Sequence, residues 1–198
     1  MNILYLIGKQ SDTPIHNFLH RDGNQILEIK GLFEDSLLKT CRIDFIISYG
    51  YRYILKKPIV DFMKGRIINL RPSYLPWNRG AHPNFWSWVE DTPKGVSIHF
   101  IDEGIDTGNI IVQREVDFEN EKGLNLYDSY IFLKEEIENL FMSSWADIKR
   151  GTFKLGIKQE GKGSFHLVKD IEKYWACLTE GWMTKIDTLQ ENIKNIKI

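Results

Sequence analysis

The sequence predicts an α/β fold with a doubly wound, mainly parallel sheet. Short apolar runs rich in isoleucine recur between residues 2 and 69, and amphipathic segments separate them. Apolar runs bounded by turn residues are typical of strands buried on both faces. Because strands and helices alternate, we expect crossover connections and ligand-binding loops at the carboxyl ends of the strands.

The elements follow from local periodicity. Residues 12–20 begin with a capping residue and place Ile15, Phe18 and Leu19 on one side, which predicts a short helix, and residues 33–40 predict another. The spacing of apolar residues over 124–149 predicts a long amphipathic helix. The predicted strands are residues 2–7, 25–30, 44–48 and 66–69.

The sequence pattern changes after residue 150. A chain of 198 residues suits one domain of ordinary size, which we place at residues 1–150. Residues 151–198 are expected to form a C-terminal extension with a strand, a Gly-rich turn, a second strand and a final helix.

Composition excludes several classes of function. With 26 basic and 27 acidic residues the net charge is -1, so the sequence predicts no binding of nucleic acid or of an anionic membrane and favours a small-molecule partner. Cys41 and Cys177 lack metal-type spacing and no signal or anchor is evident, which predicts a reduced, cytoplasmic protein without metal. Residues 8–13 carry one glycine, which disfavours a dinucleotide-binding turn.

Two motifs carry the chemistry. INLRPSYLPWNRGAHPNFW (residues 68–86) and GVSIHFIDEGIDTG (residues 95–108) resemble the catalytic core of the folate-dependent formyltransferases. The resemblance implies a Rossmann-like formyltransferase fold and transfer of a formyl group from the co-substrate 10-formyltetrahydrofolate to a primary amine. Asn69 and Asp106 match the catalytic positions of the family, whereas Arg71 stands where the family has histidine.

The resemblance assigns roles to these residues. An Asn side chain donates N–H groups without adding charge, which suits Asn69 to holding the formyl oxygen as it becomes an oxyanion. Asp106 would orient the catalytic groups and help to carry protons, and His99 would support the site. Taken alone, each residue has a simpler interpretation: a turn-forming Asn, a solvated Asp and a hydrogen-bonded strand histidine.

Arg71 changes the expected chemistry. A guanidinium has no lone pair to accept a proton at neutral pH, so it cannot replace a histidine base. Its charge can stabilise an oxyanion, and it invites a salt bridge to Asp106. His82 is the candidate for a compensating imidazole; its alternative is a helix-start residue ahead of Pro83.

Ligand-binding candidates come from the loops around these motifs. The resemblance places the pterin against SYGYRYIL, although its tyrosines would pack equally well on a neighbouring helix. The cofactor-binding candidates are Tyr49, Gly50, Tyr51, Ile54, Leu55, Phe100, Ile101, Asp102 and Ile105. The substrate-binding candidates are Ser73, Trp77, Arg79 and Gly80.

The C-terminal extension, residues 151–198, also bears on the identity of the formyl acceptor. Gln159, Phe165, His166, Lys169 and Asp170 resemble a pattern in relatives that formylate nucleotide-linked amino sugars, although QEGKGS is equally natural as a solvated turn. The leading hypothesis is therefore formylation of such a sugar for a surface polysaccharide. A folate-binding protein with impaired catalysis and a 10-formyltetrahydrofolate hydrolase are the alternatives.

Other acceptors and partners are weighed in the same way. Relatives that act on initiator tRNA carry a larger basic C-terminal domain, and those acting on glycinamide ribonucleotide carry a Gly-rich phosphate loop, so both acceptors are disfavoured. A homodimer is a further possibility, because the aromatic residues Tyr174, Trp175 and Trp182 need cover.

Overall fold

The computed structural model describes residues 1–8, 13–118, 123–153 and 156–195. The chain forms two compact units, each assembled from three stretches. Unit 1 comprises Met1–Arg71, Ile98–Val112 and Ile137–Gln159. Unit 2 comprises Pro72–Ser97, Gln113–Glu136 and Glu160–Ile198. The division into a domain of residues 1–150 and an extension of residues 151–198 stays a prediction.

A six-stranded sheet confirms the predicted fold class. β1 pairs in parallel with β2 and β3, and β3 pairs in parallel with β4. All four predicted strands are present with ends shifted by at most two residues. The strands lie in the order β2 (Gln25–Ile29), β1 (Asn2–Ile7), β3 (Phe45–Tyr49), β4 (Ile67–Arg71), β6 (Gly95–Phe100) and β7 (Ile110–Glu115).

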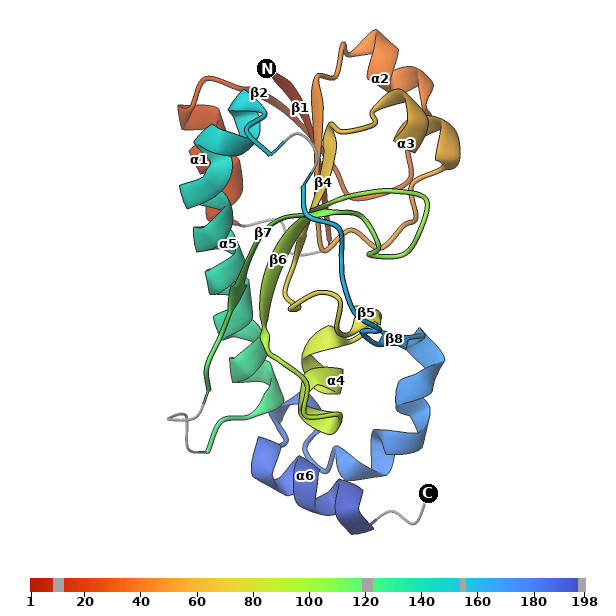
Figure 1. Ribbon diagram of the computed structural model, residues 1–198, viewed down its shortest axis with the longest axis vertical. Helices are drawn as coiled ribbons and strands as arrows, with labels where there is room; N and C mark the ends of the chain where they lie inside the picture. The colour runs from red at the N-terminus through yellow and green to blue at the C-terminus, as the bar shows by residue number, and fades with distance from the viewer. Residues whose placement is uncertain (9–12, 119–122, 154–155, 196–198) are drawn as a thin grey trace. The chain divides into compact units, whose positions relative to one another are not determined.

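Helices cover both faces of the sheet in unit 1, as a doubly wound fold requires. Figure 1 shows α1 (Pro14–Arg21) on one side of β1 and β3, and α2 (Ser36–Thr40) and α3 (Lys57–Phe62) on the other. Side chains from α2 and α3 pack against the sheet in one buried cluster, made of Leu4, Leu6, Leu38, Ile43, Ile46, Ile59, Met63 and Ile67. On the opposite face Phe45 meets Trp145 of α5 (Leu126–Arg150) edge to face.

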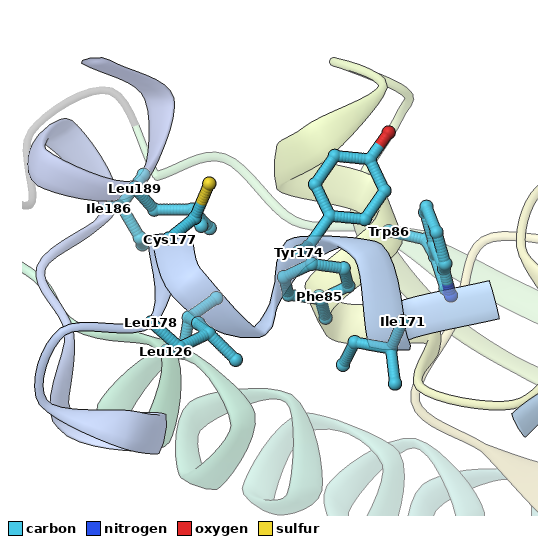
Figure 2. Close-up of a cluster of buried hydrophobic side chains, with 9 residues drawn as sticks. All are labelled: Phe85, Trp86, Leu126, Ile171, Tyr174, Cys177, Leu178, Ile186 and Leu189. Atoms are coloured by element: carbon cyan, nitrogen blue, oxygen red, sulfur yellow. The ribbon is translucent and has the colours of Figure 1, made fainter. Parts of the chain in front are cut away.

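Unit 2 has an apolar core of its own, drawn in Figure 2. It joins α4 (Pro83–Val89), η1 (Val168–Cys177) and α6 (Ile186–Asn195), with η2 (Gly181–Met183) between the last two. Phe85 and Trp86 of α4 are both buried in this core. Tyr174 is covered by this core without a partner subunit, whereas Trp175 and Trp182 are about half exposed. The core residues are Phe85, Trp86, Leu126, Ile171, Tyr174, Cys177, Leu178, Ile186 and Leu189.

The second strand and the final helix predicted for residues 151–198 are present, whereas the pairing within the tail differs from a hairpin. In the region of the predicted first strand, Ile157 forms only an isolated bridge, and residues 154–155 lie outside the described residues. β8 (Phe165–His166) pairs in parallel with β5 (Arg79–Gly80) instead of folding back on the preceding segment. The reason lies in the Gly-rich turn, where Gly163 packs so tightly on the Pro76 carbonyl that a Cβ would collide with it. The Ser164 carbonyl then accepts a hydrogen bond from the Arg79 N–H, so the backbone of the tail is satisfied by the 76–81 segment.

Cys41 and Cys177 are both free thiols, the first exposed and the second buried. In the parts of the chain that the structure describes, no helix has the length and apolar character needed to cross a membrane.

Candidate active site

Strand β4 ends at the candidate site. Asn69 and Arg71 lie two residues apart on this strand and so project from the same face. The Ile101 N–H donates to the Ile67 carbonyl at 3.0 Å, and the side chains of Asn69 and His99 meet two residues further along. These contacts run in opposite directions along β4 and β6, so the strands are antiparallel here. This pairing places His99 beside Asn69.

A buried ion pair joins Arg71 to Asp106. Arg71 Nη1 lies 2.8 Å from Asp106 Oδ2, and the two side chains are 9% and 13% exposed. The predicted salt bridge is therefore confirmed. Burial lowers the pKa of Arg71 and the Asp106 carboxylate opposes that shift, so the guanidinium stays charged beside its partner. The site holds a fixed positive charge next to a carboxylate.

His99 is held as a neutral imidazole of one tautomer. Its Nδ1 lies 2.8 Å from the Phe100 carbonyl, which can only accept, so Nδ1 carries the hydrogen. Nε2 is then the acceptor for Asn69 Nδ2 at 3.2 Å, and it lies 3.6 Å from Asp106 Oδ1, too far for a hydrogen bond. Burial, the largest influence, lowers the pKa of His99. Nδ2 of Asn69 keeps a second hydrogen that can face a ligand.

The lowered pKa of His99 predicts acid sensitivity. Below pH ~6.5 an unfolded histidine binds a proton that the folded one resists, so folding stability should fall as pH drops from 7 to 5. His99→Asn should reduce this slope, which we would measure as the midpoint of thermal unfolding at both pH values. His82, whose pKa burial also lowers, accounts for a residual slope. Asp22 does not contribute to this change in stability between pH 7 and 5. Its pKa is lowered to about 2, so the stability that its carboxylate provides is lost only at more acid pH. An unchanged slope in His99→Asn would refute this assignment.

Asp106 occupies a strained position in a tight loop. Its φ is 55°, in the left-handed region that non-glycine residues rarely adopt. Gly104 and Gly108 lie on either side of Asp106, and neither has a positive φ. Both positions require glycine because of close packing. A Cβ on Gly104 would collide with Thr107 Oγ1, and a Cβ on Gly108 would collide with the Phe100 carbonyl.

Sequence reasoning missed Thr107. Its Oγ1 donates to Asp102 Oδ1 at 2.6 Å, and Asp102 Oδ1 also accepts from the Gly104 N–H. Asp102, a predicted cofactor ligand, thus shapes the loop that carries Asp106. The spacing of Asp102, Gly104 and Thr107 is the signal that would have indicated this bond.

The remaining cofactor-binding candidates differ in their burial and in their contacts. Tyr49 is buried, and its hydroxyl donates to Glu138 Oε1 at 2.9 Å, so its side chain is part of the interior of unit 1. The Tyr51 hydroxyl donates to the Gly31 carbonyl, while Leu55 and Ile101 pack against the core cluster. Gly50 has a positive φ and Phe100 is partly exposed. Ile54 and Ile105 are the exposed apolar side chains of the set.

The substrate candidates and His82 belong to unit 2. Ser73 Oγ donates to the carbonyl of Trp77 at 2.7 Å, which closes that turn. Arg79 and Gly80 form β5 and pair with β8. His82 stacks on Trp182 with ring centroids 5.6 Å apart. No group of metal-ligating side chains occurs within the described ranges.

Known proteins have sequences similar to this chain. Methionyl-tRNA formyltransferase of Fusobacterium nucleatum is 31% identical over 147 residues, which cover 72% of this chain and 46% of that protein. The trifunctional purine biosynthetic protein adenosine-3 of Drosophila pseudoobscura pseudoobscura is 44% identical over 80 residues, 40% of this chain and 6% of that protein. The chain thus spans less than half the length of these two relatives.

A solved structure matches along nearly the full length of both chains. It is the formyltransferase PseJ from Anoxybacillus kamchatkensis in complex with UDP-4,6-dideoxy-4-formamido-L-AltNAc and tetrahydrofolate. PseJ is 45% identical with a TM-score of 0.88, and the match covers 96% of this chain and 97% of that one. Residues 9–136 match the formyl transferase family. The chain therefore belongs to the formyl transferase family of enzymes.

Proposed function

We propose that the protein transfers a formyl group from 10-formyltetrahydrofolate to the primary amine of a nucleotide-linked amino sugar. The observation that carries the reaction is the buried cluster of Asn69, Arg71, His99 and Asp106, where a charged pair meets an oriented amide. The acceptor class is supported by the similarity to PseJ, which was solved with a UDP-linked formamido sugar and tetrahydrofolate. In this function the enzyme works in the cytoplasm and supplies a surface polysaccharide.

The first step forms the new bond. The acceptor nitrogen attacks the formyl carbon, and the electron pair of the C=O bond moves onto oxygen. The second N–H of Asn69 Nδ2 donates to this oxyanion, with the amide held in place by His99 Nε2. Arg71 adds a fixed positive charge in a buried setting, where electrostatic stabilisation is strong.

The second step moves protons and breaks the old bond. Asp106 accepts a proton from the attacking nitrogen, because a carboxylate has free lone pairs whereas a guanidinium has none. The oxyanion then re-forms the C=O bond as the bond between the formyl carbon and N10 breaks; the electron pair of the broken bond stays on N10, which takes up the proton that Asp106 accepted. The products are tetrahydrofolate and a formamido sugar. No step of this route requires a metal ion.

The ligand-binding residues are part of the proposal. We assign the pterin to the loops at residues 49–55 and 100–106, where Ile54 and Ile105 offer exposed apolar contacts. Ser73, Trp77, Arg79 and Gly80 are assigned to the acceptor. His82 stays a candidate supporting residue.

A panel of acceptors tests the function. The wild-type protein would be incubated with 10-formyltetrahydrofolate and a UDP-linked 4-amino-4,6-dideoxy sugar, methionyl-tRNA, glycinamide ribonucleotide or no acceptor, following tetrahydrofolate release. We expect release only with the sugar. Release with no acceptor indicates hydrolysis, and release with tRNA or glycinamide ribonucleotide overturns the acceptor assignment.

A second candidate function is folate binding with impaired catalysis. It is favoured by the Arg71 guanidinium, which already contacts Oδ2 of the Asp106 carboxylate, the group that a proton-transfer step would use. Arg71→His distinguishes the two functions in the same assay. Turnover by the variant alone would favour the second candidate, whereas turnover by the wild-type protein would exclude it.

A further inference from the structure

The segment Gly156–Gln159, which follows α5, lies along the loop that carries Asp106. Ile110 and Ile157 form an isolated antiparallel bridge, in which their N–H groups donate to each other's carbonyls at 2.8 and 2.7 Å. Gln159 Nε2 donates to the carbonyls of Asp106 at 2.9 Å and Gly108 at 2.7 Å. One side-chain amide thereby joins the two carbonyls that flank Thr107.

We infer that Gln159 is a positioning residue that holds Asp106 in its left-handed conformation. Asp106 has a φ of 55°, which an L-residue keeps only where its surroundings impose it. Rotation of the backbone on either side of Thr107 would turn one of these carbonyls away from Gln159 and break a hydrogen bond. The position of the carboxylate against Arg71 thus depends on a residue far along the chain.

The close packing of Gly156, in the same segment, supports this inference. Its φ is 57°, and a Cβ there would lie 2.9 Å from both Asn109 Cβ and the Ile110 carbonyl oxygen. Such contacts are closer than a side chain tolerates, so the approach of the segment to the loop requires glycine. The backbone therefore brings Gln159 into reach of the Asp106 loop, and the side chain completes the contact.

The test separates the donors of Gln159 from its size. Gln159→Glu keeps the length but leaves a carboxylate that donates nothing, and Gln159→Met removes both donors without adding charge. Gln113→Glu is the matched control, because Gln113 Nε2 also donates to a backbone carbonyl, that of Leu75 at 3.1 Å, which is no part of the Asp106 loop. The first readout is amide hydrogen exchange in peptides covering residues 102–112.

We expect both Gln159 variants to raise exchange in these peptides about tenfold, with the rest of the protein unchanged. Gln113→Glu should leave residues 102–112 as in the wild type. The kinetic expectation rests on the proposed function: kcat should fall about tenfold, with less than about twofold change in KM for either substrate, because the loss appears in the transition state.

Two results would overturn the inference. Unchanged exchange at residues 102–112 in both Gln159 variants would show that the loop holds its own shape. A rise spread over the whole protein would show a general structural role. If the wild-type protein transfers no formyl group, the proposed function fails while the exchange result still decides the role of Gln159.

Discussion

We expect Asp106→Asn to lower formyl transfer by about 10³-fold, because an amide cannot accept the proton that the attacking nitrogen loses. The same change should lower the free energy of unfolding by about 3–5 kcal/mol, since it leaves the buried Arg71 guanidinium without a compensating charge. Asn tolerates left-handed backbone at least as well as Asp does, so the fold of the loop at φ 55° is preserved. Steady-state kinetics and urea unfolding measure the two effects.

Asp91→Asn is the matched control for this variant. Asp91 also has a positive φ, 48°, and pairs with a lysine, Lys94, at 3.4 Å, but its side chain is 91% exposed. Exposed ion pairs contribute little, so this variant should change stability by less than about 1 kcal/mol and leave turnover intact. Equal effects of the two substitutions would contradict the special role of the buried pair.

The second large effect is expected from Arg71→Met, which keeps the bulk of the side chain and removes its charge. Loss of the oxyanion-stabilising charge should lower kcat by about 10²-fold or more. Asp106 would be left buried without its cation, which should again destabilise the protein by about 3–5 kcal/mol. The measurements are the same as for Asp106→Asn.

The double variant Arg71→Met/Asp106→Asn separates stability from catalysis. With both charges removed, most of the lost stability should return, because neither partner is left buried and uncompensated. Activity should stay lost. Arg114→Met, which breaks an exposed pair with Glu136, provides the surface control. Additive loss of stability in the double variant would show that the ion pair does not couple the two residues.

The sheet was predictable because its signal is local. Isoleucine-rich runs mark β1 to β4 directly, and the long apolar periodicity marks α5. Helix α3 (Lys57–Phe62) was not predicted; its Ile59 packs against the sheet in the buried cluster, which is a tertiary contact. The parallel pairing of β8 with β5 was missed for a related reason: strands so far apart in sequence leave no mark in a local pattern.

In the candidate site, too, some features could be predicted from the sequence and others could not. The resemblance of the two motifs to the folate-dependent formyltransferases named Asn69, Arg71 and Asp106, and the chemistry of their side chains predicted the ion pair. The tautomer of His99 depends on the Phe100 carbonyl, which only the backbone path reveals. The left-handed conformation of Asp106 and the two bonds from Gln159 are likewise tertiary features that local preference does not contain.

The most direct test of the proposed function is product analysis by mass spectrometry. The wild-type protein would be incubated with 10-formyltetrahydrofolate and an excess of a UDP-linked 4-amino-4,6-dideoxy sugar, with Asp106→Asn in parallel. We predict a product heavier than the acceptor by one CO unit, in large molar excess over the wild-type enzyme and nearly absent with Asp106→Asn. Folate binding without product, or equal product from both proteins, would contradict a formyl transfer that depends on the Arg71–Asp106 pair.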